Sequence, residues 1–106
     1  MFVKQLSVFI ENREGRLEQV TDVIRKENIN ILSLSMADTT EYGLLRMVVS
    51  DPEKAKAALT EGGFSAMLTS VLAVKLEDKV GALDMMTHIL CSQSLNIEYM
   101  YALASA

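Results

Sequence analysis

Apolar and polar residues alternate at the start of the chain, and the apolar spacing then changes from two to three and four. Leu6, Val8 and Ile10 fall on one side of the first ten residues, which predicts a half-buried strand. A polar turn follows over residues 11–15. From residue 16 to residue 27 the apolar positions recur at helical spacing, with charged residues on the far side, and this predicts an amphipathic helix.

The next forty residues continue with three strands and one helix. Asn28 is expected to end the first helix, because asparagine tolerates a left-handed backbone. Asp51 can cap a second helix that begins with Pro52 and stops at Gly62-Gly63. The remaining pattern predicts strands over residues 29–37, 42–50 and 64–69.

This order of elements over residues 1–69, βαββαβ, is the ferredoxin-like arrangement. It predicts an α+β fold in which a four-stranded antiparallel sheet carries both helices on one face. The opposite face is then bare, and an apolar bare face marks an interface. The candidates to lie on it are Phe9, Ile31, Leu44 and Val48.

Residues 6–40 and 72–106 share one pattern at a constant offset of 66 positions. An ungapped repeat of this length predicts one supersecondary unit built twice. The copies of the first strand, turn, helix and second strand fall at 71–76, 77–81, 82–93 and 96–103. The predicted domains are a complete unit over residues 1–69 and a partial βαβ unit over residues 70–106.

The partial unit has no counterpart of the third strand, the second helix or the fourth strand. One helix on two strands cannot bury enough surface alone. We expect the partial unit to borrow cover from the first unit, from another chain, or from residues beyond Ala106.

Composition narrows the class of protein. Half of the 106 residues are apolar and 23% are charged, which is typical of a globular domain. No apolar run approaches the roughly 20 residues of a membrane span, and the N-terminus does not resemble a signal peptide. The single cysteine, Cys91, cannot form an internal disulfide. These features predict a cytoplasmic protein with no membrane partner.

The charge pattern and the small number of nucleophilic residues argue against nucleic-acid binding, catalysis and metal binding. The net charge is −4 and the basic residues are scattered, which argues against a nucleic-acid partner. His88 and Cys91 are three apart on one predicted helix, but no third group orients them, so catalysis is disfavoured. No second Cys or His stands at metal-ligand spacing. The sequence predicts no enzyme, no metal and no cofactor.

The segment Ile-Glu-Asn-Arg-Glu-Gly-Arg-Leu at residues 10–17, followed by Glu-Asn-Ile-Asn-Ile at 27–31, resembles the ACT domain. The resemblance covers residues 2–74, and residues 71–103 match the first half of a second ACT domain. It implies a small ferredoxin-like module that binds an amino acid and regulates a metabolic enzyme. The serine-sensing regulatory domain of bacterial phosphoglycerate dehydrogenase is similar, as are tandem ACT proteins.

The resemblance also implies a ligand position. In the dehydrogenase domain, two asparagines hold the amino acid between neighbouring domains. A histidine and a proline of that domain are replaced by other residues in both copies of this chain. The candidate ligand residues carried over in this way are Asn12, Glu14, Gly15 and Asn30 in the first copy and Asp78, Gly81 and Asn96 in the second.

These residue types suit an amino acid. A helix N-terminus attracts the ligand's carboxylate, and Gly15 and Gly81 let the ligand approach the backbone because they lack a Cβ. Asn12 can both donate and accept hydrogen bonds, whereas Asp78 only accepts and favours the ammonium group. The two turns should therefore differ in ligand preference.

Structural readings of the same residues stay open. Gly15 and Gly81 can simply begin a helix, and Asn12 and Asp78 can be helix caps. Asn30 and Asn96 can anchor a strand edge through backbone contacts.

The leading function is a non-catalytic regulatory module that senses a free amino acid at an interface between ACT units. Its expected partners are a second copy, as a homodimer or higher homo-oligomer, and a metabolic enzyme. The alternative is a ligand-free scaffold that pairs sheets between chains. RNA binding ranks last, because residues 44–48 lack the aromatics on which RNA-recognition motifs stack bases.

Overall fold

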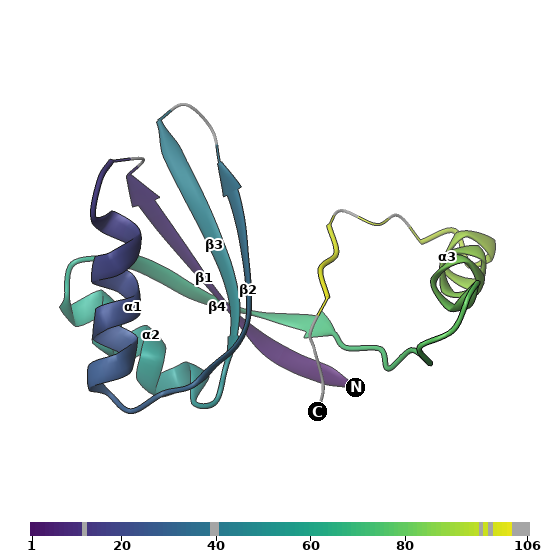
Figure 1. Ribbon diagram of the computed structural model, residues 1–106, viewed down its shortest axis with the longest axis horizontal. Helices are drawn as coiled ribbons and strands as arrows, with labels where there is room; N and C mark the ends of the chain where they lie inside the picture. Colours follow the sequence, from purple (N-terminus) through teal and green to yellow (C-terminus); the bar gives the residue numbers. More distant parts are fainter. Residues whose placement is uncertain (12, 39–40, 96, 98, 103–106) are drawn as a thin grey trace.

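The structure, a computed structural model, describes residues 1–106 apart from 12, 39–40, 96, 98 and 103–106 (Figure 1). Seven elements follow one another along the described chain: β1 (Phe2–Glu11), α1 (Arg16–Lys26), β2 (Ile31–Asp38), β3 (Tyr42–Val49), α2 (Pro52–Glu61), β4 (Ser65–Leu72) and α3 (Ala82–Ser92).

The four strands form one sheet in the order β2-β3-β1-β4, and every neighbouring pair is antiparallel. Figure 1 shows α1 and α2 together on one face of this sheet. The predicted α+β, ferredoxin-like fold is therefore confirmed. We call the opposite face of the sheet the open face.

The hydrophobic core lies between the helices and the two central strands. Alternate residues of β1 and β3 point into it, as period-two alternation requires. The core is completed by residues of both helices and of the turns that follow them. Its buried members are Leu6, Val8, Ile10, Val20, Ile24, Ile29, Leu45, Met47, Val49, Ala55, Leu59 and Phe64.

The predicted helix ends are confirmed, each with a local cause. The Asp51 side chain accepts a hydrogen bond from the Lys54 N–H at 3.3 Å, and Pro52 occupies the first helical position. Asn28 has a φ of 58°, so the chain turns and the N–H of Ile29 reaches back to the carbonyl of Ile24 at 3.2 Å.

Three of the four residues predicted for the open face lie there. Phe9 and Leu44 pair directly, Val48 pairs with Ser33 on the same side, and their chain neighbours point into the core. The prediction for Ile31 is wrong. This residue pairs with Val49 and packs against the core, because a bulge between Ile31 and Ser33 shifts the alternation of β2 by one residue.

The strands predicted for the second copy do not form in the described residues. β4 runs on to Leu72, past the predicted end at residue 69, so Val71 and Leu72 belong to the first sheet. Residues 73–77 belong to no strand. The same holds for Ile97 and for residues 99–102, the described part of the other predicted strand.

Residues 73–102 form a C-terminal arm that leaves the sheet, carries α3 and returns to the open face (Figure 1). The arm makes the molecule long, with extents of 42 × 31 × 22 Å. The radius of gyration is 15.5 Å, against about 13 Å for a compact chain of this length. The arm is therefore an extended attachment to one compact unit.

Candidate functional site

The turn before α1 recurs before α3, bond for bond. We call residues 11–16 the first elbow and residues 77–82 the second elbow. In the first, the N–H of Arg13 donates to the Glu11 carbonyl at 2.9 Å, and the Arg16 N–H donates to the Arg13 carbonyl at 3.3 Å. The second elbow repeats both bonds at the same two distances, between Lys79 and Glu77 and between Ala82 and Lys79.

Each elbow contains a glycine in left-handed conformation, which stands directly before the helix. Gly15 has a φ of 84° and Gly81 a φ of 87°, a region that residues with a Cβ rarely enter. Neither helix receives a side-chain cap among the described residues. The N–H groups of Arg16 and Ala82 already donate to carbonyls of their elbows. The positive end of the helix dipole and the N–H groups that follow in the first turn can still attract an anion such as an amino-acid carboxylate.

The ends of α1 and α3 repeat as well. Ser94 has a φ of 59°, close to the 58° of Asn28, and Leu95 donates to the Leu90 carbonyl at 3.1 Å as Ile29 does to Ile24. The repeat seen in the sequence is therefore a repeat of backbone structure, from each elbow to the end of the following helix.

Arg16, the last residue of the first elbow, has no charged equivalent in the second elbow. The Arg16 guanidinium stacks over the Phe64 ring at 4.4 Å, and its Nη1 donates to Gln19 Oε1 at 2.7 Å. Its Nε is buried and has no hydrogen-bond partner among the described residues. Ala82 stands at the equivalent position. Arg16 is not among the ligand residues expected from the sequence, although it directly follows Gly15.

Among the predicted ligand residues, Glu14, Gly15 and Asn30 are all exposed in the first copy. The Asn30 N–H donates to Ser50 Oγ at 2.9 Å, and the Ser50 N–H donates to the Asn30 carbonyl at 2.9 Å. The main chain of Asn30 therefore anchors the strand edge, as the structural reading expects. Its exposed side-chain amide has no partner among the described residues.

Gly15 and Asn30 do not come together within one chain. They lie at opposite ends of α1, whose 11 residues span about 16 Å. In the second copy Asp78 and Gly81 are exposed. The two elbows also lie at opposite ends of the molecule (Figure 1). The candidates Asn12 and Asn96 lie outside the described residues.

Two hollows in the described surface lie away from the elbows. One lies between α2 and β4 beside Leu68, and the other lies along α1 beside Asp22.

A polar cluster joins the arm to the open face. Gln5 is 1% exposed; its Nε2 donates to Tyr99 Oη at 3.0 Å, and its Oε1 accepts from Tyr101 Oη at 2.7 Å. The Arg46 guanidinium lies 3.7 Å from the centre of the Tyr99 ring, and Ser33 Oγ donates to the Ala102 carbonyl at 2.9 Å.

The cluster perturbs one titrating group. Burial raises the pKa of the Tyr101 hydroxyl above its ordinary value; the nearby Tyr99 raises it further, and Arg46 opposes the shift. The sequence gave no sign that Gln5, in the first strand, would be the partner of Tyr99 and Tyr101.

His88 and Cys91, the two residues with the most reactive side chains, lie on α3. His88 Nε2 lies 3.8 Å from a carboxylate oxygen of Asp84, and Cys91 is exposed. Hydrogen bonds from Arg25 and Lys26 hold the pKa of the exposed Asp22 carboxyl below its usual value. In the part of the chain that the structure describes, no three His, Cys, Asp or Glu residues gather as a metal site.

Membrane-spanning helices are absent from the described residues, where every helix is too short or too polar to cross a bilayer.

Comparisons with known proteins agree with the fold and with the repeat. A family model described as the ACT domain pair matches residues 1–105. The structure of protein BT0572 from Bacteroides thetaiotaomicron superposes with a TM-score of 0.93 and 43% identity, over 99% of this chain and 73% of that one. Among curated proteins none matches.

Two other solved structures share parts of the fold. The ACT domain of prephenate dehydrogenase from Bacillus anthracis is 29% identical with a TM-score of 0.53, over 59% of this chain and 99% of that one. The regulatory subunit of aspartate kinase from Thermus thermophilus is 17% identical with a TM-score of 0.68, over 96% of this chain and 80% of that one. The family match extends over both elbows and all three helices, and the chain therefore belongs to the ACT domain pair family.

Proposed function

We propose that this chain is a non-catalytic regulatory module that binds a free amino acid at the first elbow, against a neighbouring ACT unit. The observation that carries the proposal is the uncapped N-terminus of α1 behind Gly15, in a chain of the ACT family. ACT domains are regulatory modules. Two of the similar structures are parts of named enzymes: the regulatory subunit of aspartate kinase and the ACT domain of prephenate dehydrogenase.

The ligand's carboxylate would accept hydrogen bonds from the first-turn N–H groups of α1, and Arg16 adds positive charge at the same end. Asn30 would act from a different unit, because within one chain it lies about 16 Å away at the far end of α1. The side-chain amide of Asn30 is exposed and can donate to the carboxylate or accept from the ammonium group.

Regulation would follow from differential stabilisation. A ligand held between two units stabilises the packing in which both halves of the site meet. That change in packing alters the activity of an enzyme partner or the state of the oligomer. The homodimer or higher oligomer, the enzyme partner and the cytoplasmic location belong to this proposal.

Isothermal titration with each of the twenty amino acids tests the proposal. We expect binding of at least one, and about tenfold weaker binding for Asn30→Ala, because a hydrogen bond to a charged group is lost. The matched control is Asn28→Gly, which removes a neighbouring amide at a left-handed position that glycine adopts freely. Arg16→Gln should also weaken binding.

The second candidate is the ligand-free scaffold, which the exposed apolar side chains of α3 and the open face favour. Stable self-association without heat from any amino acid would support the scaffold and contradict the sensor. Equal binding by the Asn30→Ala and Asn28→Gly variants would contradict the site as drawn.

A further inference from the structure

The polar cluster on the open face contains a cation that pairs with no anion among the described residues. Arg46 lies between Leu45 and Met47, which are buried in the core, so its side chain points to the open face. Its guanidinium lies flat against the Tyr99 ring, 3.7 Å from the ring centre, and forms no ion pair with a described carboxylate. Stacking uses the face of a guanidinium and leaves the N–H groups at its edge free to donate.

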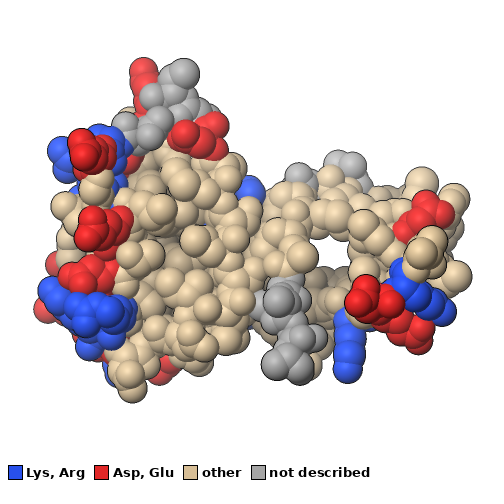
Figure 2. Space-filling view, in the orientation of Figure 1, with Lys and Arg blue, Asp and Glu red and all other residues tan. Residues whose placement is uncertain are grey.

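The side chains that surround Arg46 on the open face are neutral. In the antiparallel register, Ser7 of β1 and Ser35 of β2 stand directly opposite Arg46, with Cβ atoms about 4.5–5.5 Å away. Leu44 and Val48 precede and follow Arg46 on the same face of β3. In the view of Figure 2, the surface where the arm meets the sheet is largely uncharged. The charge of Arg46 is therefore not compensated by its neighbours in the sheet.

Two hydroxyl groups beside this cation each have a hydrogen left to donate. Gln5 Nε2 donates to Ser7 Oγ at 3.1 Å and to Tyr99 Oη at 3.0 Å. Both oxygens accept in these bonds, so each hydroxyl keeps its own hydrogen for a further bond. Neither hydrogen has an acceptor among the described residues, although Ser7 is only 6% exposed. A buried donor without an acceptor is unfavourable, and a bound acceptor removes that cost.

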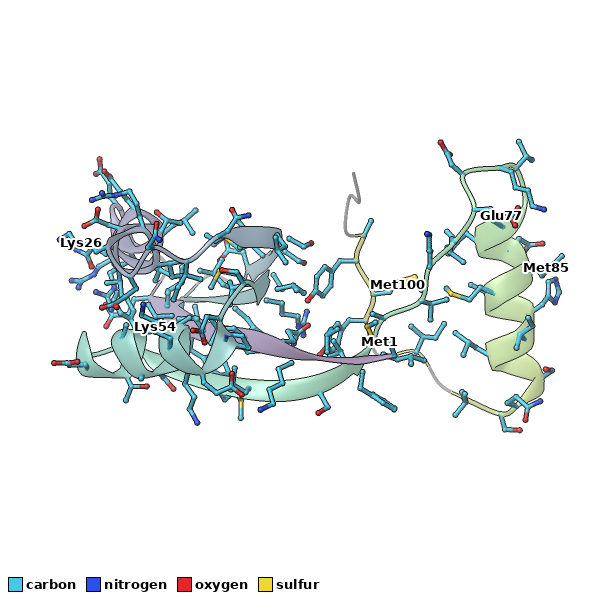
Figure 3. All side chains as sticks on the ribbon, turned by 90° about the horizontal axis from the view of Figure 1, so that it is seen from below. Met1, Lys26, Lys54, Glu77, Met85 and Met100 are labelled. Atoms are coloured by element: carbon cyan, nitrogen blue, oxygen red, sulfur yellow. The ribbon has the colours of Figure 1, made fainter. Side chains whose placement is uncertain are left out.

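The arm holds these donors close together. Tyr99 is bound twice, by its ring to Arg46 and by its hydroxyl to Gln5, and Tyr101 Oη donates to Gln5 Oε1 at 2.7 Å. Figure 3 shows the segment that carries Met100 beside the sheet, whereas α3 stands apart from it. The guanidinium and the two hydroxyls thus form one group of donors on a rigid sheet, partly covered by the arm.

The chemistry of these groups selects a type of ligand. A planar carboxylate accepts two parallel hydrogen bonds from the edge of a guanidinium, and a carbonyl oxygen next to it suits hydroxyl donors. The ammonium group of an amino acid needs an acceptor or a negative charge. The Gln5 side-chain oxygen is already bonded to Tyr101, and no acidic residue stands beside Arg46 in the sheet. A carboxylate with a neighbouring carbonyl and no amino group fits these donors best.

We propose that Arg46, Ser7 and Tyr99 form a binding site for a small 2-oxo acid between the open face and the arm. The carboxylate lies at the edge of the Arg46 guanidinium, and the ligand's oxygens accept the hydrogens of the two hydroxyls. The site is separate from the first elbow, because α1 lies on the opposite face of the sheet (Figure 1). It does not depend on amino-acid binding.

Two-dimensional amide NMR spectra of the full chain with pyruvate, alanine and inorganic phosphate test the proposal. Pyruvate should shift the amide signals of Ser7, Arg46 and Tyr99, with a dissociation constant of about 1 mM. Alanine has the same carbon skeleton with an ammonium group in place of the carbonyl, and it should leave these signals in place. Phosphate, a non-planar anion, should do the same and serves as the control for a general anion site.

Arg46→Gln should weaken pyruvate binding at least tenfold, because hydrogen bonds to a charged group are lost. Arg25→Gln is the matched control, since it removes the same charge from the exposed side of α1. Tyr99→Phe keeps the ring that stacks on Arg46 and removes only the hydroxyl. It should weaken pyruvate binding severalfold while the Arg46 signal without pyruvate stays in place, which separates loss of a donor from loss of the arm contact.

Three results would overturn the proposal. One is the absence of shifts at Ser7 and Arg46 at pyruvate concentrations up to roughly 10 mM. Another is equal pyruvate binding by the Arg46→Gln and Arg25→Gln variants. The third is an equal response of these signals to alanine or to phosphate, because the site would then not select a 2-oxo acid. Binding of an amino acid at the first elbow is read from different signals, those of Gly15 and its neighbours, so the two proposals fail separately.

Discussion

At the scale of single residues, Gln5 is one of the contacts that tie the arm to the sheet, and it is the most deeply buried of them. Its amide nitrogen donates to Tyr99 and to Ser7, and its amide oxygen accepts from Tyr101. A buried side-chain amide stabilises the fold only while its N–H and C=O groups keep their hydrogen-bond partners. Loss of one partner that leaves a buried polar atom unpaired costs about 1–3 kcal/mol.

The hydroxyl of Tyr101 gives this contact a pH dependence. Burial raises its pKa, so the folded chain holds the proton more tightly than the unfolded chain does. The stabilisation is fully present below the ordinary tyrosine pKa and is lost as the pH rises through the raised folded-state pKa. Tyrosinate absorbance should show a titration step above the ordinary tyrosine pKa, and Tyr101→Phe should remove that step. A titration without such a step in the unsubstituted chain would refute the contact.

Single residues were predictable where the backbone demanded a residue type. Gly15 and Gly81 could be read from the sequence, because a left-handed φ at a helix start selects glycine. The buried position of Gln5 could not be predicted from the sequence, because a polar residue in a strand usually faces water. Its partners Tyr99 and Tyr101 stand 94 and 96 positions further along the chain.

At the scale of elements, α1 and α3 show that forming a helix and burying it are separate events. Both begin after a left-handed glycine, both are followed two residues later by a residue with positive φ, and both span 11 residues. Only α1 lies on a sheet. The local sequence predicted both helices, because caps and spacing are local; it did not predict their different burial, which depends on distant strands.

The glycines that begin the two helices provide a test of this difference. Alanine at either position costs about 1 kcal/mol, because a Cβ disfavours the left-handed backbone. Gly15→Ala should lower the global unfolding free energy by that amount, since α1 is part of the core. Gly81→Ala should affect only the exchange of α3 amides. Urea denaturation together with hydrogen exchange separates the two effects, and an equal loss of global stability would show that α3 unfolds with the core.

The strands of the second copy were predicted and did not form. Residues 73–77 and 99–102 have the strand pattern, but a strand needs a neighbour to pair with, and the repeat supplies no copy of β3. The bulge that turned Ile31 into the core had no signal in the sequence either.

At the scale of the whole molecule, one compact unit carries an arm that places the second elbow far from the first (Figure 1). Charged side chains gather over the helices of the compact unit and over the outer part of the arm, while the surface between them is largely uncharged (Figure 2). The separation of Gly15 from Asn30 along α1 means that a ligand touching both must lie between two units. Ligand binding should therefore be coupled to how units associate.

The central claim, that the first elbow holds an amino acid, is tested most directly by two-dimensional amide NMR spectra recorded with each of the twenty amino acids. At least one should shift the amide signals of Gly15, Arg16 and Leu17, together with that of Asn30, and leave those of α2 and β4 in place. If no amino acid moves the elbow signals, or if the shifts gather on α2 and β4 instead, the claim is contradicted.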